Sequence, residues 1–347
     1  MSFPRELQER LTRLRDRFIG EASTGGDYWD SEETLAAYDA TFGERIGWKW
    51  DAVLAELALR SWKPPAGTVL VDFGCGSGVA VQRVVAAFGA THFSAVHLGD
   101  LSPLATSFAS RKLRERFPAL EVRTATPAPQ IPEGPFTLIV SHVINELNPA
   151  ERAALLRIAE RAAATIWVEP GTSDAAGMLV VIREALRETM RVIAPCTHGA
   201  PCGLQTPENA RHWCHHFARP PTVAFTESFW AEFGRALSID MRSLPYSFLV
   251  LDAQRSEAAT PAGVSRVIGQ PREYKGFSRL LVCSAEGVAD RILQKRDDPA
   301  LFKELDRTRR PFLYRFEFDD EHVRSGTQWP PPDPDRDTRS QTASPVP

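Results

Sequence analysis

Three alternating glycines follow an apolar stretch of the chain and form a pattern typical of a ligand-binding turn. The glycines are Gly74, Gly76 and Gly78, and residues 69–73 before them are all apolar apart from Asp72. An unbroken apolar run is typical of a parallel strand covered by helices on both faces. Glycine tolerates positive φ and lets a ligand approach the backbone, and the helix expected at 79–88 begins with unpaired N–H groups. We therefore expect this turn to cradle a nucleotide-like ligand.

An acidic residue after the next expected strand indicates which ligand fits. The strand at 93–98 runs into Gly99 and Asp100, and a carboxylate there is placed to accept hydrogen bonds from ribose hydroxyls. The glycine pattern alone also begins dinucleotide-binding folds, so a nicotinamide site, or an empty relic of one, remains the alternative. The turn followed by the acidic residue resembles the first two motifs of class I S-adenosylmethionine-dependent methyltransferases. This resemblance implies S-adenosyl-L-methionine as the cofactor and the following binding residues: Asp72, Gly74, Gly76, Gly78 and Asp100.

Polar residues follow the fourth expected strand, at 136–141. His142, Asn145 and Glu146 come directly after it. Ligands of open α/β sheets bind at the carboxyl ends of the strands, so these side chains border the expected crevice. His142 or Glu146 is a candidate general base, and a polar loop without a catalytic role is the alternative.

The order of expected elements predicts an α/β fold with a doubly wound, mostly parallel sheet. From residue 68 onward strands alternate with helices, which implies parallel pairing through right-handed crossovers. Late apolar runs at 246–252 and 279–283 are expected to form an antiparallel pair that closes the sheet, as in class I methyltransferases. An N-terminal helical region at 1–64, with one helix running from Ser31 to Arg60, precedes this domain, which we assign to 65–326. The proline-rich and polar residues 327–347 are expected to be a disordered tail.

A cysteine-rich insertion at about 192–222 interrupts the methyltransferase-like domain. Its thiols follow the spacing C-x5-C-x11-C, and one more lies on a late expected strand; the four are Cys196, Cys202, Cys214 and Cys283. Thiolates bind both zinc and iron–sulfur clusters, and His198, His212, His215 and His216 also allow a Cys3His zinc site. Buried free cysteines are the alternative. A metal would staple an irregular segment that has few apolar residues.

Composition and charge bound the class of protein. The 347 residues are 43% hydrophobic and 24% charged, which is ordinary for a globular protein and excludes a disordered chain. No apolar stretch reaches the roughly 20 residues needed to span a bilayer, and the arginine-rich N-terminus also carries acidic residues, unlike a transit peptide. We therefore expect a cytoplasmic protein without membrane association. The net charge of −3 gives no general attraction to DNA or RNA, so nucleic-acid contacts must come from local patches such as 111–116.

The sequence motifs together resemble one family. The run Val168-Glu169-Pro170-Gly171-Thr172, the cysteine–histidine run at 195–202, Trp213-Cys214-His215 and the late run 276–283 resemble the methyltransferase-like protein 17 family of mitochondrial small-ribosomal-subunit assembly factors and its bacterial relatives. The resemblance covers roughly residues 30–300. It implies a [4Fe–4S] cluster held by Cys196, Cys202, Cys214 and Cys283, and association with the small ribosomal subunit and its rRNA. The chain departs from the family at Gly203, where a proline is common.

Two functions follow from these observations. The first is a cofactor-binding, iron–sulfur-containing assembly factor of the small ribosomal subunit, since no Asp/Asn-Pro-Pro-Tyr motif follows the fourth strand. The second is an active methyltransferase on rRNA or on a small molecule, since the glycine turn and Asp100 are both intact. Catalysis would then rest mainly on positioning the methyl donor and acceptor. The residues alone do not choose between the two functions.

Overall fold

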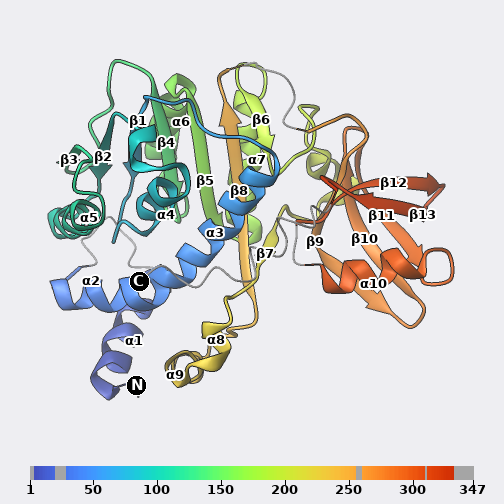
Figure 1. Cartoon of the computed structure of the whole chain (residues 1–347), viewed down its shortest axis with the longest axis horizontal. Helices are drawn as coiled ribbons and strands as arrows, with labels where there is room; N and C mark the ends of the chain where they lie inside the picture. The colour runs from blue at the N-terminus through green and yellow to red at the C-terminus, as the bar shows by residue number, and fades with distance from the viewer. Residues whose placement is uncertain (1–3, 20–28, 255–259, 309–310, 332–347) are drawn as a thin grey trace. The chain divides into compact units, whose positions relative to one another are not determined.

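The computed structural model describes residues 4–19, 29–254, 260–308 and 311–331 (Figure 1). The chain divides into two compact units. The first contains Met1–Pro195 and His212–Glu257, and the second contains Cys196–Arg211 and Ala258–Pro347. The region 65–326 and the insertion 192–222, each expected as one piece, are therefore both divided between the two units.

The first unit is an eight-stranded sheet with helices around it. Its α-helices are α1 (Arg5–Ile19), α2 (Glu32–Tyr38), α3 (Glu44–Leu59), α4 (Val79–Phe88), α5 (Pro103–Arg116), α6 (Pro149–Arg161), α7 (Ser173–Leu186), α8 (Val223–Thr226) and α9 (Ser228–Ala236). A π-helical turn, Asp39–Gly43, joins α2 to α3, and a 3-10 turn lies at Ala90–His92. The strands are β1 (Val69–Phe73), β2 (Ala95–Gly99), β3 (Val122–Ala125), β4 (Phe136–Ser141), β5 (Ala164–Pro170), β6 (Arg191–Ala194), β7 (His216–Ala218) and β8 (Leu244–Asp252).

The strand order confirms the doubly wound fold of class I methyltransferases. The sheet runs β3-β2-β1-β4-β5-β8-β6, with β7 paired to β8 off this path. The neighbours from β3 to β5 pair in parallel, whereas β8 is antiparallel to β5, β6 and β7. The expected strand at 246–252 is thus confirmed as the antiparallel member of the sheet. Because the order reverses between β1 and β4, a crevice forms at the carboxyl ends of these strands.

Apolar side chains pack the helices onto the sheet. On one face, α6 and α7 bury Leu155, Leu179 and Leu186 against Phe136 and Trp167 of the strands. Helices α3 and α4 pack against each other in front of the sheet as Figure 1 draws it. Burial of one such Leu or Phe side chain stabilises a fold by about 1.5–3 kcal/mol, so this layer holds the strand ends in place.

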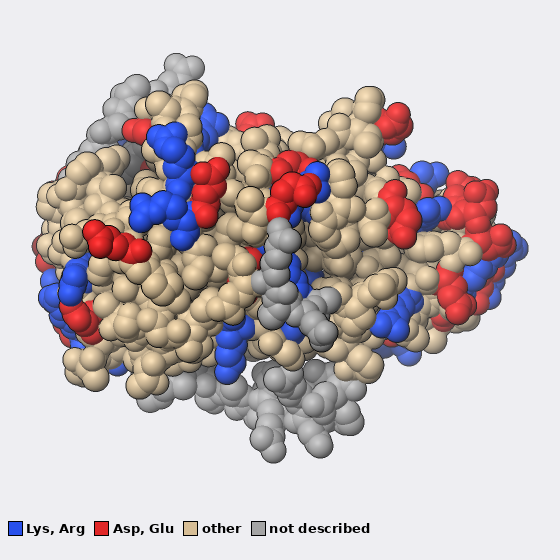
Figure 2. All heavy atoms as spheres, turned by 90° about the horizontal axis from the view of Figure 1, so that it is seen from above, with Lys and Arg blue, Asp and Glu red and all other residues tan. Residues whose placement is uncertain are grey.

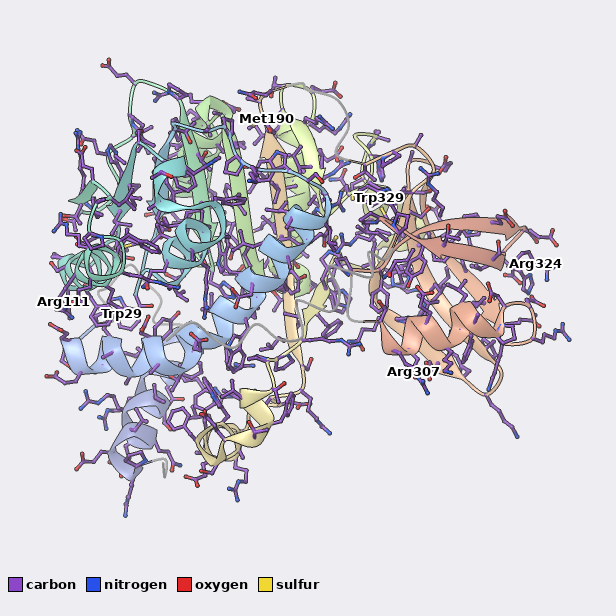
Figure 3. The ribbon with its side chains drawn as sticks, in the orientation of Figure 1. Trp29, Arg111, Met190, Arg307, Arg324 and Trp329 are labelled. Carbon is purple, nitrogen blue, oxygen red and sulfur yellow. The ribbon has the colours of Figure 1, made fainter. Side chains whose placement is uncertain are left out.

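Most of the described residues within 1–64 are helical, as the sequence predicts for this region. Ser31 caps α2, because its Oγ accepts a hydrogen bond from the backbone N–H of Thr34 at 3.2 Å. Leu35 of α2 packs against Phe108 of α5, and Trp29, which is labelled in Figure 3, meets Tyr38 edge-on with ring centroids 5.0 Å apart. The region therefore covers one side of the sheet. None of the helices within the described ranges is long and apolar enough to cross a membrane.

The second unit is a closed five-stranded barrel. It contains β9 (Ser265–Tyr274), β10 (Phe277–Ser284), β11 (Gly287–Gln294), α10 (Pro299–Arg307), β12 (Leu313–Asp319) and β13 (His322–Gln328), with two 3-10 turns at Gly203–Gln205 and Pro207–Asn209. Around the barrel the order is β10-β11-β13-β12-β9, closed by the pairing of β9 with β10. Leu280, Leu293, Tyr314 and Val323 fill its interior together with Leu301 of α10. Arg324 lies near the outer end of the β12–β13 hairpin (Figure 3) and is hydrogen-bonded to Asp319.

The barrel corrects one prediction about the late strands. The strand at 279–283 does not pair with 246–252; it is part of β10 and pairs with β9 and β11. Within 279–283 only Arg279 is charged and the four residues after it are apolar, and the register shifts between Arg279 and Leu281, so the local pattern does not reveal its partner. Strand β13 extends to Gln328, past the start of the expected tail, and residues 332–347 of that tail lie outside the described residues.

Candidate functional site

A cavity of about 370 Å³ lies at the carboxyl ends of the parallel strands of the first unit. It is lined by the glycine turn after β1, by Asp100 after β2 and by the loop after β4. Five of the residues singled out from the sequence line this one cavity: Gly74, Gly76, Asp100, His142 and Glu146. Asp72 and Gly78 support it from beneath and from the start of α4. The structure therefore brings the predicted cofactor-binding and catalytic candidates together.

The turn after β1 has a conformation that only glycine adopts easily. Gly74, Gly76 and Gly78 have φ values of 73°, 50° and 79°. A Cβ at Gly74 would lie 2.5 Å from Val143 Cγ2, and one at Gly78 would lie 2.9 Å from the Cβ of Ala109. A Cβ at Gly76 would meet nothing within 4 Å of the protein. Two glycines thus permit tight packing, while Gly76 leaves open space beside the cavity.

Two carboxylates meet beneath the turn. Asp100 Oδ2 accepts a hydrogen bond from the N–H of Gly76 at 2.9 Å, and Oδ1 accepts one from Ser102 at 3.0 Å. Asp72 is fully buried, and neither of its oxygens has a hydrogen-bond partner among the described residues. Burial raises the pKa of Asp72 to about 8, and the charge of Asp100 contributes to this rise. The backbone N–H of Val81 has the smaller, opposite effect of lowering the pKa.

Helix α3 brings a lysine to the histidine of the β4 loop. Lys49 Nζ lies 3.2 Å from His142 Nε2, and Trp50 Nε1 donates to Ser141 Oγ at 2.9 Å. Burial, and then the positive charge of Arg45, lower the pKa of Lys49 to about 7. Burial, and then Lys49, hold the pKa of His142 well below its ordinary value. A neutral His142 that accepts from Lys49 carries its proton on Nδ1, which has no partner among the described residues.

Two glutamates lie close to the β4 loop: Glu146 lines the cavity, and Glu169 is buried behind it. Glu169 ends β5 in a fully buried position, and its Oε1 accepts hydrogen bonds from the N–H groups of Ile144 at 3.3 Å and Val143 at 3.4 Å. Burial raises the pKa of Glu169 to about 8 in spite of these bonds. Burial, and then Asp100, raise the pKa of Glu146 to about 7. Groups that titrate near neutral pH are the ones suited to proton transfer.

His142 also has an unusual backbone. Its φ of 58° lies in the left-handed region, where a residue with a Cβ is disfavoured by about 1–3 kcal/mol. Its N–H donates to Val168 O at 2.9 Å, which fixes this conformation against β5. Strained residues of this kind are concentrated at functional sites, and this one faces the cavity.

The lysine and Glu169 were not identified as site residues from the sequence. Lys49 is a charged residue of an amphipathic helix and is indistinguishable there from a solvated one. Glu169 lies in the family-like run 168–172, but its only local signal is a charge at the end of an apolar strand. Both meet the β4 loop through pairings between distant parts of the chain.

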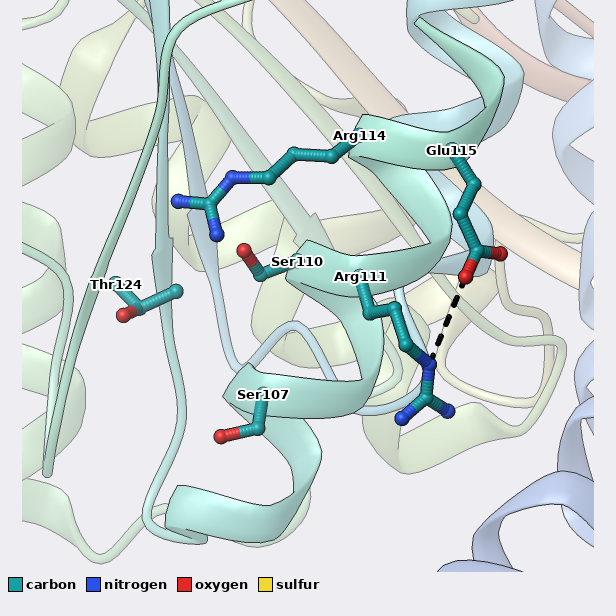
Figure 4. A pocket seen from close by; sticks show the side chains of 6 residues that line it. All are labelled: Ser107, Ser110, Arg111, Arg114, Glu115 and Thr124. Atoms are coloured by element: carbon teal, nitrogen blue, oxygen red, sulfur yellow. Dashed lines mark ion pairs between the residues drawn. The ribbon is translucent and has the colours of Figure 1, made fainter. Parts of the chain in front are cut away.

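The basic run at 111–116 does not form an open cationic face. A shallow pocket of about 500 Å³ lies between α5 and β3, and Arg111 is paired there with Glu115 at 3.8 Å (Figure 4). Arg111 also pairs with Glu32, Lys112 pairs with Asp39, and Arg114 donates to a backbone carbonyl of β3. On the face in Figure 2, basic and acidic side chains are interspersed. These contacts favour a structural role for the run.

The four predicted metal ligands are divided between the units. Cys196, Cys202 and Cys283 belong to the second unit and Cys214 to the first. In the second unit Cys283 Sγ lies 3.5 Å from His198 Nε2; in the first, Cys214 Sγ lies 3.7 Å from His216 Nε2. Across the described ranges, no group of three or more His, Cys, Asp or Glu side chains is arranged to hold a metal ion.

The segment with Cys202 is attached to the barrel by Gly203. A Cβ at Gly203 would lie 2.6 Å from the backbone N of Val288, and Asn209 Nδ2 donates to Val288 O at 3.0 Å. A side chain at position 203 would collide with β11, so this close approach requires glycine.

The chain matches the family model described as mitochondrial small ribosomal subunit Rsm22 over residues 46–309. The chain belongs to this family. The match confirms the resemblance to mitochondrial small-subunit assembly factors that the motifs indicate. It spans parts of both units: strands β9–β11 and helix α10 of the barrel lie within the matched residues, whereas β12 and β13 lie beyond them.

Solved structures of low sequence identity are similar to the chain. Magnesium protoporphyrin IX methyltransferase from Synechocystis, with bound S-adenosylmethionine, is 15% identical, with 71% of this chain and 97% of that one covered and a TM-score of 0.38. A putative RNA methyltransferase from Pyrococcus horikoshii is 12% identical, with 71% and 96% covered and a TM-score of 0.34. TM-scores this low carry no argument about function. No curated protein matches the chain.

Proposed function

We propose that the protein is an S-adenosylmethionine-binding, methyltransferase-like factor that acts on the small ribosomal subunit in the cytoplasm. The observation that carries the proposal is the cavity formed by the glycine turn, Asp100 and the β4 loop, in a chain of the Rsm22 family. The family description names the small ribosomal subunit, and the cavity supplies the chemistry of a nucleoside-binding site. Contact with rRNA is part of the proposal.

The residues around the cavity fit S-adenosylmethionine. The open space beside Gly76 lets a ligand approach the backbone, and the carboxylate of Asp100, which lines the cavity, is a hydrogen-bond acceptor for hydroxyl groups. Asp72 is buried beneath the turn and carries a proton near neutral pH, and the positive charge of a bound ammonium or sulfonium group would favour its ionised form. Leu101, Pro129 and Leu155 provide apolar walls. The combination of apolar surface with few polar groups is typical of a cofactor site.

Bound S-adenosylmethionine supplies an electrophilic methyl group. In such a transfer the protein's contribution is chiefly orientation of the donor and acceptor. Lys49 and His142 together carry at most one positive charge at neutral pH, because the pKa of Lys49 is about 7 and that of His142 lies well below the ordinary histidine value. This pair, with Glu146, gives the cavity proton acceptors for an acceptor group that must lose a proton.

We also propose a [4Fe–4S] cluster held by Cys196, Cys202, Cys214 and Cys283, with zinc as the alternative. The support is the thiolate chemistry, the spacing of the cysteines and the family membership. Iron, sulfide and zinc per chain are measured after anaerobic purification. Each Cys→Ser variant is expected to lose the metal, whereas Cys75→Ser, which removes the buried thiol of the glycine turn, is expected to keep it. Full metal content in the four variants would contradict the assignment.

Two measurements test the main function. Sedimentation of a gently lysed extract in low magnesium is expected to place the protein with the small subunit, and high salt is expected to release it. Calorimetric titration with S-adenosylhomocysteine is expected to show one site per chain that Gly76→Ala removes. A protein that stays at the top of every gradient would refute the ribosomal role, and a wild type that binds no cofactor would refute the assignment of the cavity.

An active methyltransferase is the second candidate. The observation that favours it is a group of titratable side chains: His142 and Glu146 line the cavity, and behind them Lys49 contacts His142 while Glu169 accepts hydrogen bonds from the β4 loop. Small subunits from cells lacking the protein, incubated with it and with methyl-labelled cofactor, are expected to gain label under this function. Wild type and Gly76→Ala giving equal background label would exclude it for that substrate.

A further inference from the structure

The barrel has the connectivity of an oligonucleotide-binding fold. Numbered along the chain, its strands β9 to β13 close in the order 1-2-3-5-4-1, with α10 between the third and fourth strands. The third and fifth strands, β11 and β13, pair in parallel, whereas every other neighbouring pair is antiparallel. This is the five-stranded Greek-key barrel called the OB-fold. Such barrels bind oligonucleotides or oligosaccharides on the face of strands 2 and 3 and with the loops beside it.

A groove of about 830 Å³ lies on that face. Phe277 and Arg279 come from β10, and Ile292 and Gln294 come from β11. The loop between β9 and β10 adds Lys275, and the loop after β11 adds Lys295 and Arg296. The groove is therefore located where the connectivity places the binding surface.

The charge of the groove suits a polyanion. Its lining includes Lys275, Arg279, Lys295 and Arg296, and no acidic residue. Asp290 pairs with Arg279 at 3.7 Å and Asp297 with Arg296 at 3.8 Å, and both contacts involve exposed arginines, whose ion pairs are weak. The ammonium groups of the two lysines add further positive charge to the groove. A ligand with negatively charged phosphates therefore complements it better than an uncharged oligosaccharide does.

An exposed aromatic pair stands at the same edge. Tyr274 and Phe277 face each other across the β9–β10 hairpin, with ring centroids 4.8 Å apart and planes 7° apart. Tyr274 is 51% exposed, and Phe277 lines the groove. Flat aromatic rings beside a basic groove are the two components with which proteins bind single-stranded nucleic acids, because unpaired bases stack on the rings.

The other end of the barrel surface is covered. Leu281 and Cys283 of β10 are buried against Leu204 and Val288, so the segment 203–209 occupies that part of the strand. The open portion of β10 is thus confined to the end with Phe277 and Arg279.

We infer that the groove formed by Lys275, Arg279, Lys295 and Arg296, with the Tyr274–Phe277 pair, binds single-stranded RNA. The single-strand chemistry follows from the barrel itself; the choice of RNA over DNA rests on the proposed role on the small subunit.

The test is fluorescence polarisation with the full-length protein and a labelled single-stranded RNA of about 12 nucleotides, a length within the range bound by one such barrel. The same sequence as DNA, a duplex RNA and an acidic peptide are the other probes. Tyr274→Ala is expected to weaken RNA binding roughly tenfold, because a stacked base is lost. Lys275→Glu with Lys295→Glu is expected to weaken it further and to reduce the slope of log affinity against log salt by about 0.7 for each phosphate contact removed.

Arg315→Glu is the matched control, since Arg315 is exposed on β12 of the same barrel and does not line the groove. It is expected to bind RNA within about twofold of wild type, and all variants are expected to melt at the wild-type temperature. The inference is overturned if groove variants bind like Arg315→Glu, or if duplex RNA or the acidic peptide binds as tightly as the single strand. Equal affinity for the DNA strand would overturn the choice of RNA.

Sedimentation of the same variants separates this inference from the proposed function. If the groove variants lose the RNA probe but the wild type never migrates with small subunits, the ribosomal role fails and the groove stands. If wild type migrates with subunits and groove variants bind the probe normally, the groove assignment alone fails.

Discussion

Asp72 provides a quantitative test of the cofactor site, because its burial links stability to pH. The carboxyl is fully buried without a hydrogen-bond partner among the described residues, and its pKa rises from 3.8 to about 8. The folded protein therefore keeps a proton that the unfolded chain releases. Stability from this group is intact below about pH 4 and is lost progressively as the pH rises towards 8.

The size of the effect follows from the width of that range. Each pH unit between the two pKa values removes about 1.4 kcal/mol from the free energy of unfolding, so at pH 7 the loss is on the order of 4 kcal/mol. Asp72→Asn keeps the shape of the side chain and removes its titration. We expect the slope of unfolding free energy against pH, between pH 5 and 7, to become less negative by about 1.4 kcal/mol per unit.

The assay is urea denaturation at four pH values, with Asp306→Asn, an exposed carboxyl of α10, as the matched control. Calorimetry on the same variant is expected to show roughly tenfold weaker binding of S-adenosylhomocysteine, because asparagine cannot ionise in response to the ligand's ammonium group. If Asp72→Asn is more stable than the wild type and binds S-adenosylhomocysteine more weakly, the carboxyl group of Asp72 serves cofactor binding at the expense of stability. An unchanged slope would refute the burial argument, and an unchanged affinity would refute the role of Asp72 at the cavity.

Three further predictions concern packing. Gly76→Ala and Gly67→Ala both place a Cβ at positive φ with nothing within 4 Å, so each is expected to lower the free energy of unfolding by about 1 kcal/mol in urea denaturation. Only Gly76→Ala is expected to reduce cofactor binding in calorimetry. Equal binding by both variants would contradict the assignment of the glycine turn to the cofactor. Arg60→Met removes the buried guanidinium that pairs with Glu56 at 2.8 Å and is expected to destabilise the protein by about 3–5 kcal/mol. The double variant Glu56→Leu/Arg60→Met should recover most of this loss in the same assay, and no recovery would show that the loss does not come from the ion pair. Gly203→Ala pushes a Cβ to 2.6 Å from the backbone of β11 and is expected to speed proteolysis of the 196–211 segment, whereas Gly199→Ala, with nothing within 4 Å, should not.

Local signals explain which parts of the fold were predictable. The fourth strand was expected at 136–141 and is β4, Phe136–Ser141, because an apolar run after a proline-rich link has clear ends. Helix α6 begins at Pro149 after Asn148, whose side chain forms a capping box with Glu151. The π-helical turn within the N-terminal helix was not expected, because it hardly changes the apolar periodicity.

Pairing between distant segments explains what was missed. The strand at 279–283 was correctly read as a strand, but its partners are β9 and β11, and outward charges such as Arg279 obscure the alternation that would show a barrel. The glycine turn and Asp100 were predictable because each follows directly from a strand end. Lys49 reaches His142 across 93 positions of the chain, and no local pattern indicates such a contact.

The buried carboxyl groups near the cavity are evidence that the site is not an empty relic of a nucleotide site. Asp72 and Glu169 are fully buried, and Glu146 beside them has a raised pKa, so folding brings three poorly solvated carboxyls to one edge of the sheet. Burying an unpaired polar group costs roughly 1–3 kcal/mol, and an amide or apolar side chain of similar shape would avoid that cost. His142 adds backbone strain at the same place. An edge used only as scaffold would gain stability by losing these features, so their presence together is best explained by a ligand that interacts with them.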